Sequence, residues 1–193
     1  MQDDMRAMIP SNAKKVFSGV LFEVYQWPQE MYDGSTETFE MLRREDTAEV
    51  IAVKDGKIMM QEQEQPTKPL FLSLPGGRIS YGEEPLEGAQ RELLEETGFV
   101  SNDWSLYRSA RPLMKLDWRI HVFVAKDCVY RQAPRLDAGE RITVKWVTLD
   151  ELMDLVDCGT LARIEQDLRM DLVRAKYDAS SKEELCRRFG LPL

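Results

Sequence analysis

Residues 76–99, with the sequence GGRISYGEEPLEGAQRELLEETGF, concentrate acidic side chains in a stretch that has the pattern of a helix. Residues three and four apart share a helix face, so Glu92, Glu95 and Glu96 are expected on one side near its C-terminal end. Carboxylates placed there repel one another and oppose the helix dipole, which favours cations at that end. A divalent cation removes the penalty, because carboxylate oxygens are ligands suited to Mg²⁺, Mn²⁺ or Ca²⁺. The spacing therefore predicts a divalent-cation site.

Glycines and one arginine accompany these acids. Gly76 and Gly77 allow the backbone to approach a metal or a phosphate and to adopt a positive φ, and Gly98 is suited to end the helix. Arg91 can pair with a neighbouring glutamate and hold it in position. The plainer alternative is a solvated acidic helix, which does not need this spacing.

The same segment resembles the Nudix box, Gly-x5-Glu-x7-Arg-Glu-U-x-Glu-Glu-x-Gly-U, in which U is a bulky apolar residue. Every position of the pattern is filled, by Gly77, Glu83, Arg91, Glu92, Leu93, Glu95, Glu96, Gly98 and Phe99. The resemblance implies an enzyme that hydrolyses a diphosphate linked to another group, usually a nucleoside. It also implies a mixed sheet between helices, with the box as a loop, a helix and a second loop.

Position by position, the resemblance implies roles for these residues. Glu92 and Glu96 match the principal Mg²⁺ ligands of the family, with Mn²⁺ able to substitute, and Glu95 matches a further ligand, direct or through water. The carbonyl group of Gly76 matches the backbone ligand. Arg91 matches the residue that orients the acidic group, and Glu83 matches the residue that braces the loop.

The flanking sequence resembles the branch of the family that cleaves ADP-ribose and nucleoside-diphosphate sugars. That branch often keeps a catalytic glutamate in a loop similar to residues 137–140, which makes Glu140 the candidate general base and Asp137 a weaker candidate. An ordinary loop charge is the alternative for Glu140. The branch usually exchanges an N-terminal strand hairpin across a homodimer, and residues 16–46 look similar, so a homodimer is expected. The chain departs from the branch at residues 63–65 and at Ser73.

Four further side chains are candidates for substrate contact. Trp27 and Trp118 could stack on a purine, and Arg44 and Arg111 could contact phosphate or ribose; core packing and ordinary surface charge are the alternatives. The expected reaction is Mg²⁺-dependent cleavage of ADP-ribose or another nucleotide sugar to a nucleoside monophosphate and a sugar phosphate. The alternatives are a Nudix hydrolase of nucleoside triphosphates, dinucleoside polyphosphates or a nucleotide coenzyme, and a nucleotide-sensing regulator without turnover.

The composition narrows the function classes. The chain has 193 residues and a formal net charge of −8, which argues against non-specific binding to a nucleic-acid backbone. No apolar run approaches the ~18–20 residues of a membrane span, and residues 1–5 lack the features of a secretory signal. Cys128, Cys158 and Cys186 are widely spaced, so neither a disulfide framework nor a zinc site is expected. We expect a cytoplasmic enzyme that acts on a small nucleotide without membrane association.

Periodicity and turn residues predict the elements that position the site. Strands are expected at residues 16–27, 36–44, 48–53, 57–60, 104–107, 120–125 and 141–147. Pro28 is expected to end the first of them, and the Asp55-Gly56 pair predicts a tight hairpin. Residues 61–69 are polar and contain two prolines, so they are expected to form a loop. Pro85 opens the predicted box helix, whose buried face would comprise Leu86, Ala89, Leu93 and Leu94.

The C-terminal part is expected to be helical. Thr148 and Glu151 have the spacing of a capping box for a helix that ends near Gly159. Residues 161–177 are predicted as one long amphipathic helix, and Ser180 or Ser181 as the cap of a last short helix.

This order of elements predicts an α/β (α+β) fold of the Nudix type, with a mixed sheet between helices. We expect a single domain of residues 16–193 behind a flexible arm of residues 1–15. Within the domain, residues 16–46 would form a strand hairpin, residues 76–99 the box, and residues 160–193 the C-terminal helices.

Overall fold

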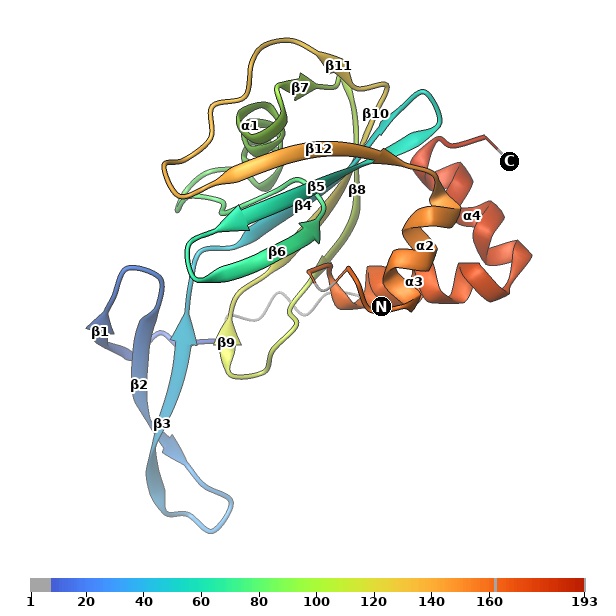
Figure 1. Ribbon diagram of the computed structural model, residues 1–193. Helices are drawn as coiled ribbons and strands as arrows, with labels where there is room; N and C mark the ends of the chain where they lie inside the picture. The colour runs from blue at the N-terminus through green and yellow to red at the C-terminus, as the bar shows by residue number, and fades with distance from the viewer. Residues whose placement is uncertain (1–7, 162, 193) are drawn as a thin grey trace.

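The computed structural model describes residues 8–161 and 163–192 (Figure 1). Its strands, in chain order, are β1 (Lys14–Ser18), β2 (Glu23–Glu30), β3 (Thr36–Arg43), β4 (Thr47–Lys54), β5 (Lys57–Gln65), β6 (Lys68–Ser73), β7 (Phe99–Val100), β8 (Asp103–Ala110), β9 (Leu116–Asp117), β10 (Ile120–Lys126), β11 (Val129–Tyr130) and β12 (Arg141–Val147). Its helices are α1 (Pro85–Thr97), α2 (Leu149–Asp157), α3 (Gln166–Tyr177) and α4 (Ala179–Phe189).

Strand β4 separates two apolar layers, because successive strand residues point to opposite faces. Ile51 and Val53 belong to the cluster that contains side chains of α2, α3 and α4. Ala48, Val50 and Ala52 belong to the cluster that contains side chains of α1. Figure 1 shows the same arrangement, with α1 and the group α2–α4 on different sides of the central strands. The predicted mixed sheet between helices is confirmed.

The central sheet has the strand order β12-β5-β4-β10-β8, and β6 pairs with β5 outside this path. β4 and β10 are parallel, whereas β5 is antiparallel to β4, β6 and β12. The Asp55-Gly56 hairpin is confirmed, with φ of 51° and 72° at these two residues. That left-handed pair matches the tight turn that suits the twist of two antiparallel strands.

Residues 61–69 do not form the predicted loop. β5 continues to Gln65, and β6 begins at Lys68 after a tight turn at Pro66 and Thr67. The error arose because Gln61 and Gln63 are polar, although both side chains are buried, at 0% and 5% exposure. Their amides find hydrogen-bond partners inside the protein, so the hydrophobic pattern does not reveal the strand.

The N-terminal region forms a hairpin that projects from the body of the molecule (Figure 1). The hairpin of β2 with β3 is confirmed, but the single strand predicted at residues 16–27 is wrong. The chain turns after β1, where the Gly19 N–H donates to the Phe22 carbonyl at 2.9 Å. Pro28 lies inside β2 rather than at its end. It is tolerated because β1 pairs with β2 only as far as Gln26, which leaves that side open.

The first residues lie partly outside the described part of the chain. β1 begins at Lys14, within the segment predicted as an arm, and residues 1–7 are among those not described.

The C-terminal helices differ from the prediction mainly at their starts. The capping box of Thr148 and Glu151 is confirmed at the start of α2. α3 begins at Gln166 instead of residue 161, because the Glu165 side chain accepts hydrogen bonds from the first backbone N–H groups and caps the helix. Asp178, not Ser180 or Ser181, caps α4. None of the helices in the described ranges is long and apolar enough to cross a membrane.

Candidate active site

Helix α1 is fixed between a proline start and a glycine end. Pro85 occupies its first turn, and Gly98 ends it with φ of 77° and an N–H donated to the Leu94 carbonyl at 2.9 Å. Ala89 and Leu93 pack in the core as predicted. Leu86 was expected there too, but it is 37% exposed. Gly88 is buried instead, and a Cβ at that position would lie 3.0 Å from the Ile79 side chain.

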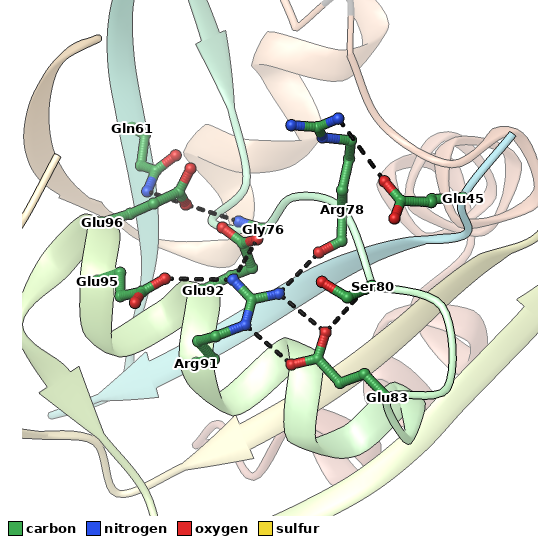
Figure 2. A network of polar contacts seen from close by, with 10 residues as sticks. All are labelled: Glu45, Gln61, Gly76, Arg78, Ser80, Glu83, Arg91, Glu92, Glu95 and Glu96. Carbon is green, nitrogen blue, oxygen red and sulfur yellow. Dashed lines mark hydrogen bonds and ion pairs between the residues drawn. The ribbon is translucent and has the colours of Figure 1, made fainter. Parts of the chain in front are cut away.

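Arg91 joins the acidic residues of the box into one network (Figure 2). Its Nε and Nη2 donate to the two carboxylate oxygens of Glu83 at 2.8 and 3.0 Å. Its Nη1 donates to Glu92 at 2.8 Å and to Glu95 at 3.2 Å. Glu83 also accepts the Ser80 N–H at 2.9 Å. Arg91 therefore holds the acids in position while Glu83 ties the loop to the helix.

Glu96 is the most deeply buried acid of the box, at 7% exposure. One of its oxygens accepts the Gly76 N–H at 2.9 Å and the Gln61 side-chain amide at 2.8 Å. Burial raises the pKa of Glu96 to about 8. Burial also raises the pKa of Glu92, although Arg91 acts in the opposite direction. Both carboxylates would thus be stabilised as anions by a nearby cation.

The loop before α1 lies against β4 so closely that only glycine fits. The carbonyls of Pro75 and Gly77 accept N–H groups of β4 at 2.8 and 2.9 Å. Gly76, between them, has φ of 143°, and a Cβ there would lie 2.1 Å from the Ala48 carbonyl oxygen. A Cβ at Gly77 would lie 2.5 Å from the Glu92 carboxylate. The loop geometry therefore places the backbone directly beside the acidic cluster.

A cavity of about 910 Å³ opens in front of these residues. Glu92, Glu95 and Glu96 line it, and so does Glu140 from the loop before β12. Burial raises the pKa of Glu140, as does the negative charge of Asp137. The charge of Glu140 in turn contributes to the raised pKa of Glu92 and of Glu96. The fold thus brings this loop to the acidic cluster, which lies more than forty residues earlier in the chain.

The oxygen donors fit a hard divalent cation, but their present arrangement is closed around Arg91. Within the described ranges, no group of three or more His, Cys, Asp and Glu side chains is already arranged to hold a metal ion. The reason is visible in the network: Arg91 binds Glu92 and Glu95, and the Gly76 N–H binds Glu96. Glu92 and Glu96, whose pKa values are raised by burial, have the oxygen donors that suit such a cation.

The predicted substrate contacts fall into two groups. Trp118 and Arg44 line the cavity, with the Arg44 guanidinium 4.8 Å from the centre of the Trp118 ring. Trp27 instead packs with Ile9 and Met41 at the hairpin, at 8% exposure. Neither Trp27 nor Arg111 is among the described residues that line the cavity.

Sequence reasoning missed a row of glutamines behind the acids. The Gln63 side-chain amide donates to Gln61 at 2.6 Å and to Ser73 at 2.7 Å, and Gln61 donates to Glu96. Gln61, Gln63 and Gln65 alternate along β5, and this spacing of two was the available signal. It was overlooked because polar residues before prolines resemble a loop.

Comparison with known proteins adds an independent finding. A family model described as NUDIX domain matches residues 43–167. An ADP-ribose pyrophosphatase of Bacillus subtilis (strain 168) is 31% identical over 157 residues, covering 75% of this chain and 80% of the relative. A methanol dehydrogenase activator of Bacillus methanolicus is 31% identical over 148 residues, covering 74% and 80%. The crystal structure of an ADP compounds hydrolase has a TM-score of 0.69 at 22% identity, covering 86% of this chain and 91% of that one, which is a likeness of fold.

Proposed function

This chain belongs to the Nudix domain family, and from that premise we propose that it hydrolyses the diphosphate of a nucleoside diphosphate linked to a sugar or a similar group. ADP-ribose or another nucleotide sugar is the proposed substrate, with a nucleoside monophosphate and a sugar phosphate as products. The observation that carries the proposal is the convergence of Glu92, Glu95, Glu96 and Glu140 on one cavity. Its volume of about 910 Å³ suits a ligand of nucleotide size.

The acidic cluster is the proposed site of a divalent cation, Mg²⁺ or Mn²⁺. Glu92, Glu95 and Glu96 would hold it together with the carbonyl group of Gly76. In the described part of the chain, β4 binds the carbonyls on either side of Gly76 and does not bind that of Gly76 itself. When bound, the cation neutralises the diphosphate and makes its phosphorus a better electrophile.

Arg91 is proposed to orient the acids of the box before the cation binds. Its two bonds to Glu83 anchor the guanidinium at the start of α1, while its contacts with Glu92 and Glu95 define where their carboxylates lie. A bidentate arginine is well suited to this task, because its planar fork fixes direction as well as distance.

Glu140 is the proposed general base. It would accept a proton from the attacking water as the new oxygen–phosphorus bond forms and the bond to the bridging oxygen breaks. Its pKa is raised, first by burial and then by the charge of Asp137, and a higher pKa makes a carboxylate a stronger base. Trp118 and the Arg44 guanidinium that lies over its ring form the proposed platform for the nucleobase, since both planar groups can stack on a purine.

The test is a substrate panel assayed with Mg²⁺ by chromatographic separation of the nucleotide products. The wild-type protein should cleave a nucleotide sugar, and Glu96→Gln should lose most turnover while remaining folded. Glu87→Gln is the matched control, because Glu87 is an exposed acid on the same helix. An unchanged rate in Glu96→Gln would overturn the assignment of the site.

The panel also separates the alternatives. Preference by orders of magnitude for triphosphates, dinucleoside polyphosphates or a coenzyme would replace the nucleotide-sugar assignment. The similarity to a protein named as a dehydrogenase activator gives a second candidate function, a nucleotide-binding regulator. Tight nucleotide binding without Mg²⁺-dependent cleavage would favour it. Substrate contacts by Trp27 and Arg111, the homodimer and the cytoplasmic location stay predictions.

A further inference from the structure

A segment outside the box forms part of the cavity wall. Arg163 and Ile164, which lie between α2 and α3, line the same cavity as the acidic cluster. We propose that Arg163 is a substrate-binding residue that holds a phosphate oxygen of the nucleotide, and that Glu49 and Glu165 position it. The proposal rests on the proposed function for its choice of ligand, and it adds a recognition residue from the C-terminal part of the fold.

The Arg163 guanidinium is available for a ligand. It is exposed, and its carbon lies 5.0 Å from the centre of the Phe71 ring. Among residues 8–161 and 163–192, no carboxylate lies within salt-bridge distance of it. Two other arginines of the cavity differ, since Arg78 pairs with Glu45 at 3.6 Å and Arg91 with the box glutamates. An arginine held over an aromatic face keeps its N–H groups free to bind a phosphate at their edge.

Other cations gather around Arg163. Burial lowers the pKa of Lys68, and the positive charge of Arg163 lowers it further. Burial also lowers the pKa of Arg44, and the positive charges of Arg78 and Arg163 lower it further. Arg44, Lys68, Arg78 and Arg163 all line the cavity of a protein whose formal net charge is −8. Like charges brought together on the wall of a cavity favour an anion between them.

The backbone that carries Arg163 is fastened to the sheet on two sides. Arg163 forms an isolated parallel bridge with Ser73, at the end of β6. The Glu165 N–H donates to a Glu49 carboxylate oxygen at 2.9 Å, which connects the segment to β4. Glu165 is itself 2% exposed and caps α3 by accepting the Asp167 and Leu168 N–H groups at 3.0 and 2.8 Å. The position of Arg163 is therefore set by the same strands that hold the box loop.

The first experiment measures binding rather than turnover. The probe is the α,β-methylene analogue of ADP-ribose, titrated calorimetrically with Mg²⁺ present. Arg163→Ala should raise Kd about tenfold or more, and Arg163→Lys should raise it less, because lysine keeps the charge but not the fork. Arg174→Ala is the control, since Arg174 is exposed on α3 and pairs with Asp171 at 3.7 Å, and it is not among the described residues that line the cavity. A Kd for Arg163→Ala within about twofold of wild type would overturn the proposal.

Two products distinguish which phosphate is held. AMP and ribose 5-phosphate each carry one phosphate of the proposed substrate. If Arg163→Ala weakens inhibition by AMP, the residue binds the nucleoside side; if it weakens inhibition by ribose 5-phosphate, it binds the side of the linked group. With ADP-ribose as substrate, KM should rise while kcat changes little. A loss confined to kcat would contradict a binding role.

The positioning role of Glu49 has its own readout. Glu49→Ala should raise Kd, whereas Glu49→Gln keeps a carbonyl oxygen that can accept the Glu165 N–H and should restore most of the affinity. Glu49→Ala should add little in the Arg163→Ala background, since it acts through that residue. Additive effects would refute the positioning role.

The two proposals can fail separately. If wild-type protein binds the analogue but cleaves no substrate on the panel, the proposed hydrolysis fails while the Kd ratios still decide the role of Arg163. No binding of the analogue by wild-type protein would overturn both.

Discussion

Replacing Gly98 with alanine should destabilise the protein more than the same replacement at Gly159. Both glycines follow a helix with a left-handed φ, 77° after α1 and 76° after α2. A Cβ at Gly98 would lie 2.0 Å from the Gln132 carbonyl oxygen, whereas a Cβ at Gly159 would meet no described atom within 4 Å. The two variants therefore share the backbone strain and differ in the steric contacts at Gly98, which also include the Tyr130 ring at 3.1 Å.

The expected magnitude follows from that comparison. Alanine in a left-handed conformation costs about 1–2 kcal/mol, partly offset by about 0.4–1 kcal/mol from the stiffer unfolded chain, and both effects apply to both variants. The shortest contact at Gly98 is with backbone, so no side-chain rotation can relieve it. Overpacking of this kind costs about 1–3 kcal/mol. We expect Gly98→Ala to lose about 1–3 kcal/mol more free energy of unfolding than Gly159→Ala.

The strain at Gly98 should also reach the cavity. The Gly98 carbonyl accepts the N–H groups of Arg131 and Gln132 at 2.8 and 3.3 Å, and the Glu95 carbonyl accepts that of Arg135 at 2.7 Å. This segment continues directly into the loop that carries Glu140. Gly98→Ala should therefore reduce kcat for the proposed reaction, and Gly159→Ala should not.

Urea unfolding followed by tryptophan fluorescence measures the difference. The midpoint should fall further for Gly98→Ala while the slope with urea stays the same in both variants, because the surface exposed on unfolding is unchanged. Equal midpoints would refute the steric reasoning, because they would show that the backbone at residues 131–132 can move without a loss of stability.

Three further predictions concern charge. Burial raises the pKa of Glu49 from 4.5 to about 7, so its contribution to the free energy of unfolding is fully present below about pH 4.5 and is lost as the pH rises through 7. Glu49→Gln should remove this loss, which is at most about 3 kcal/mol. Urea unfolding at about pH 5 and about pH 8 measures it. Arg91→Lys should lower kcat about tenfold or more with little change in the circular dichroism spectrum, because lysine cannot bind Glu83 with two parallel bonds; an unchanged kcat would contradict the orienting role. Mg²⁺ at millimolar concentration should raise Tm of wild-type protein and of Glu87→Gln but not of a variant with both Glu92 and Glu96 changed to glutamine, since a cation stabilises only the state that binds it.

The box helix and its network could be predicted because their signals are local. Arg91 and Glu83 lie two turns apart on or next to one helix, and the glycines are required by the chain geometry at their own positions. The turn at the adjacent residues Asp55 and Gly56 is also a local signal, and it fixes the β4–β5 hairpin. Position in the sequence was therefore enough to place these side chains together.

The rest of the site depends on contacts between distant segments. Gln61 can be buried because its amide donates to Glu96 and its carbonyl accepts from Gln63. Helix α3 starts late because Glu165 caps it, and the Glu165 N–H is bound by Glu49 from across the fold. Arg163 reaches the cavity through that same contact. Helical periodicity continued through residues 161–165, so pattern alone extended the helix and concealed the cap. Trp27 depends on such contacts as well, since its packing with Ile9 and Met41 at the hairpin is not visible in the local pattern of residues.

The division of β4 between two faces has a consequence for engineering. A shift of one residue in this strand would exchange Ala48, Val50 and Ala52 for Glu49, Ile51 and Val53 on the side of α1. It would also move the carbonyl against which Gly76 rests. An insertion or deletion within β4 should thus disable both helical layers together, whereas the turn at residues 31–35, at the far tip of the hairpin, offers a place to graft a peptide or a fluorophore (Figure 1).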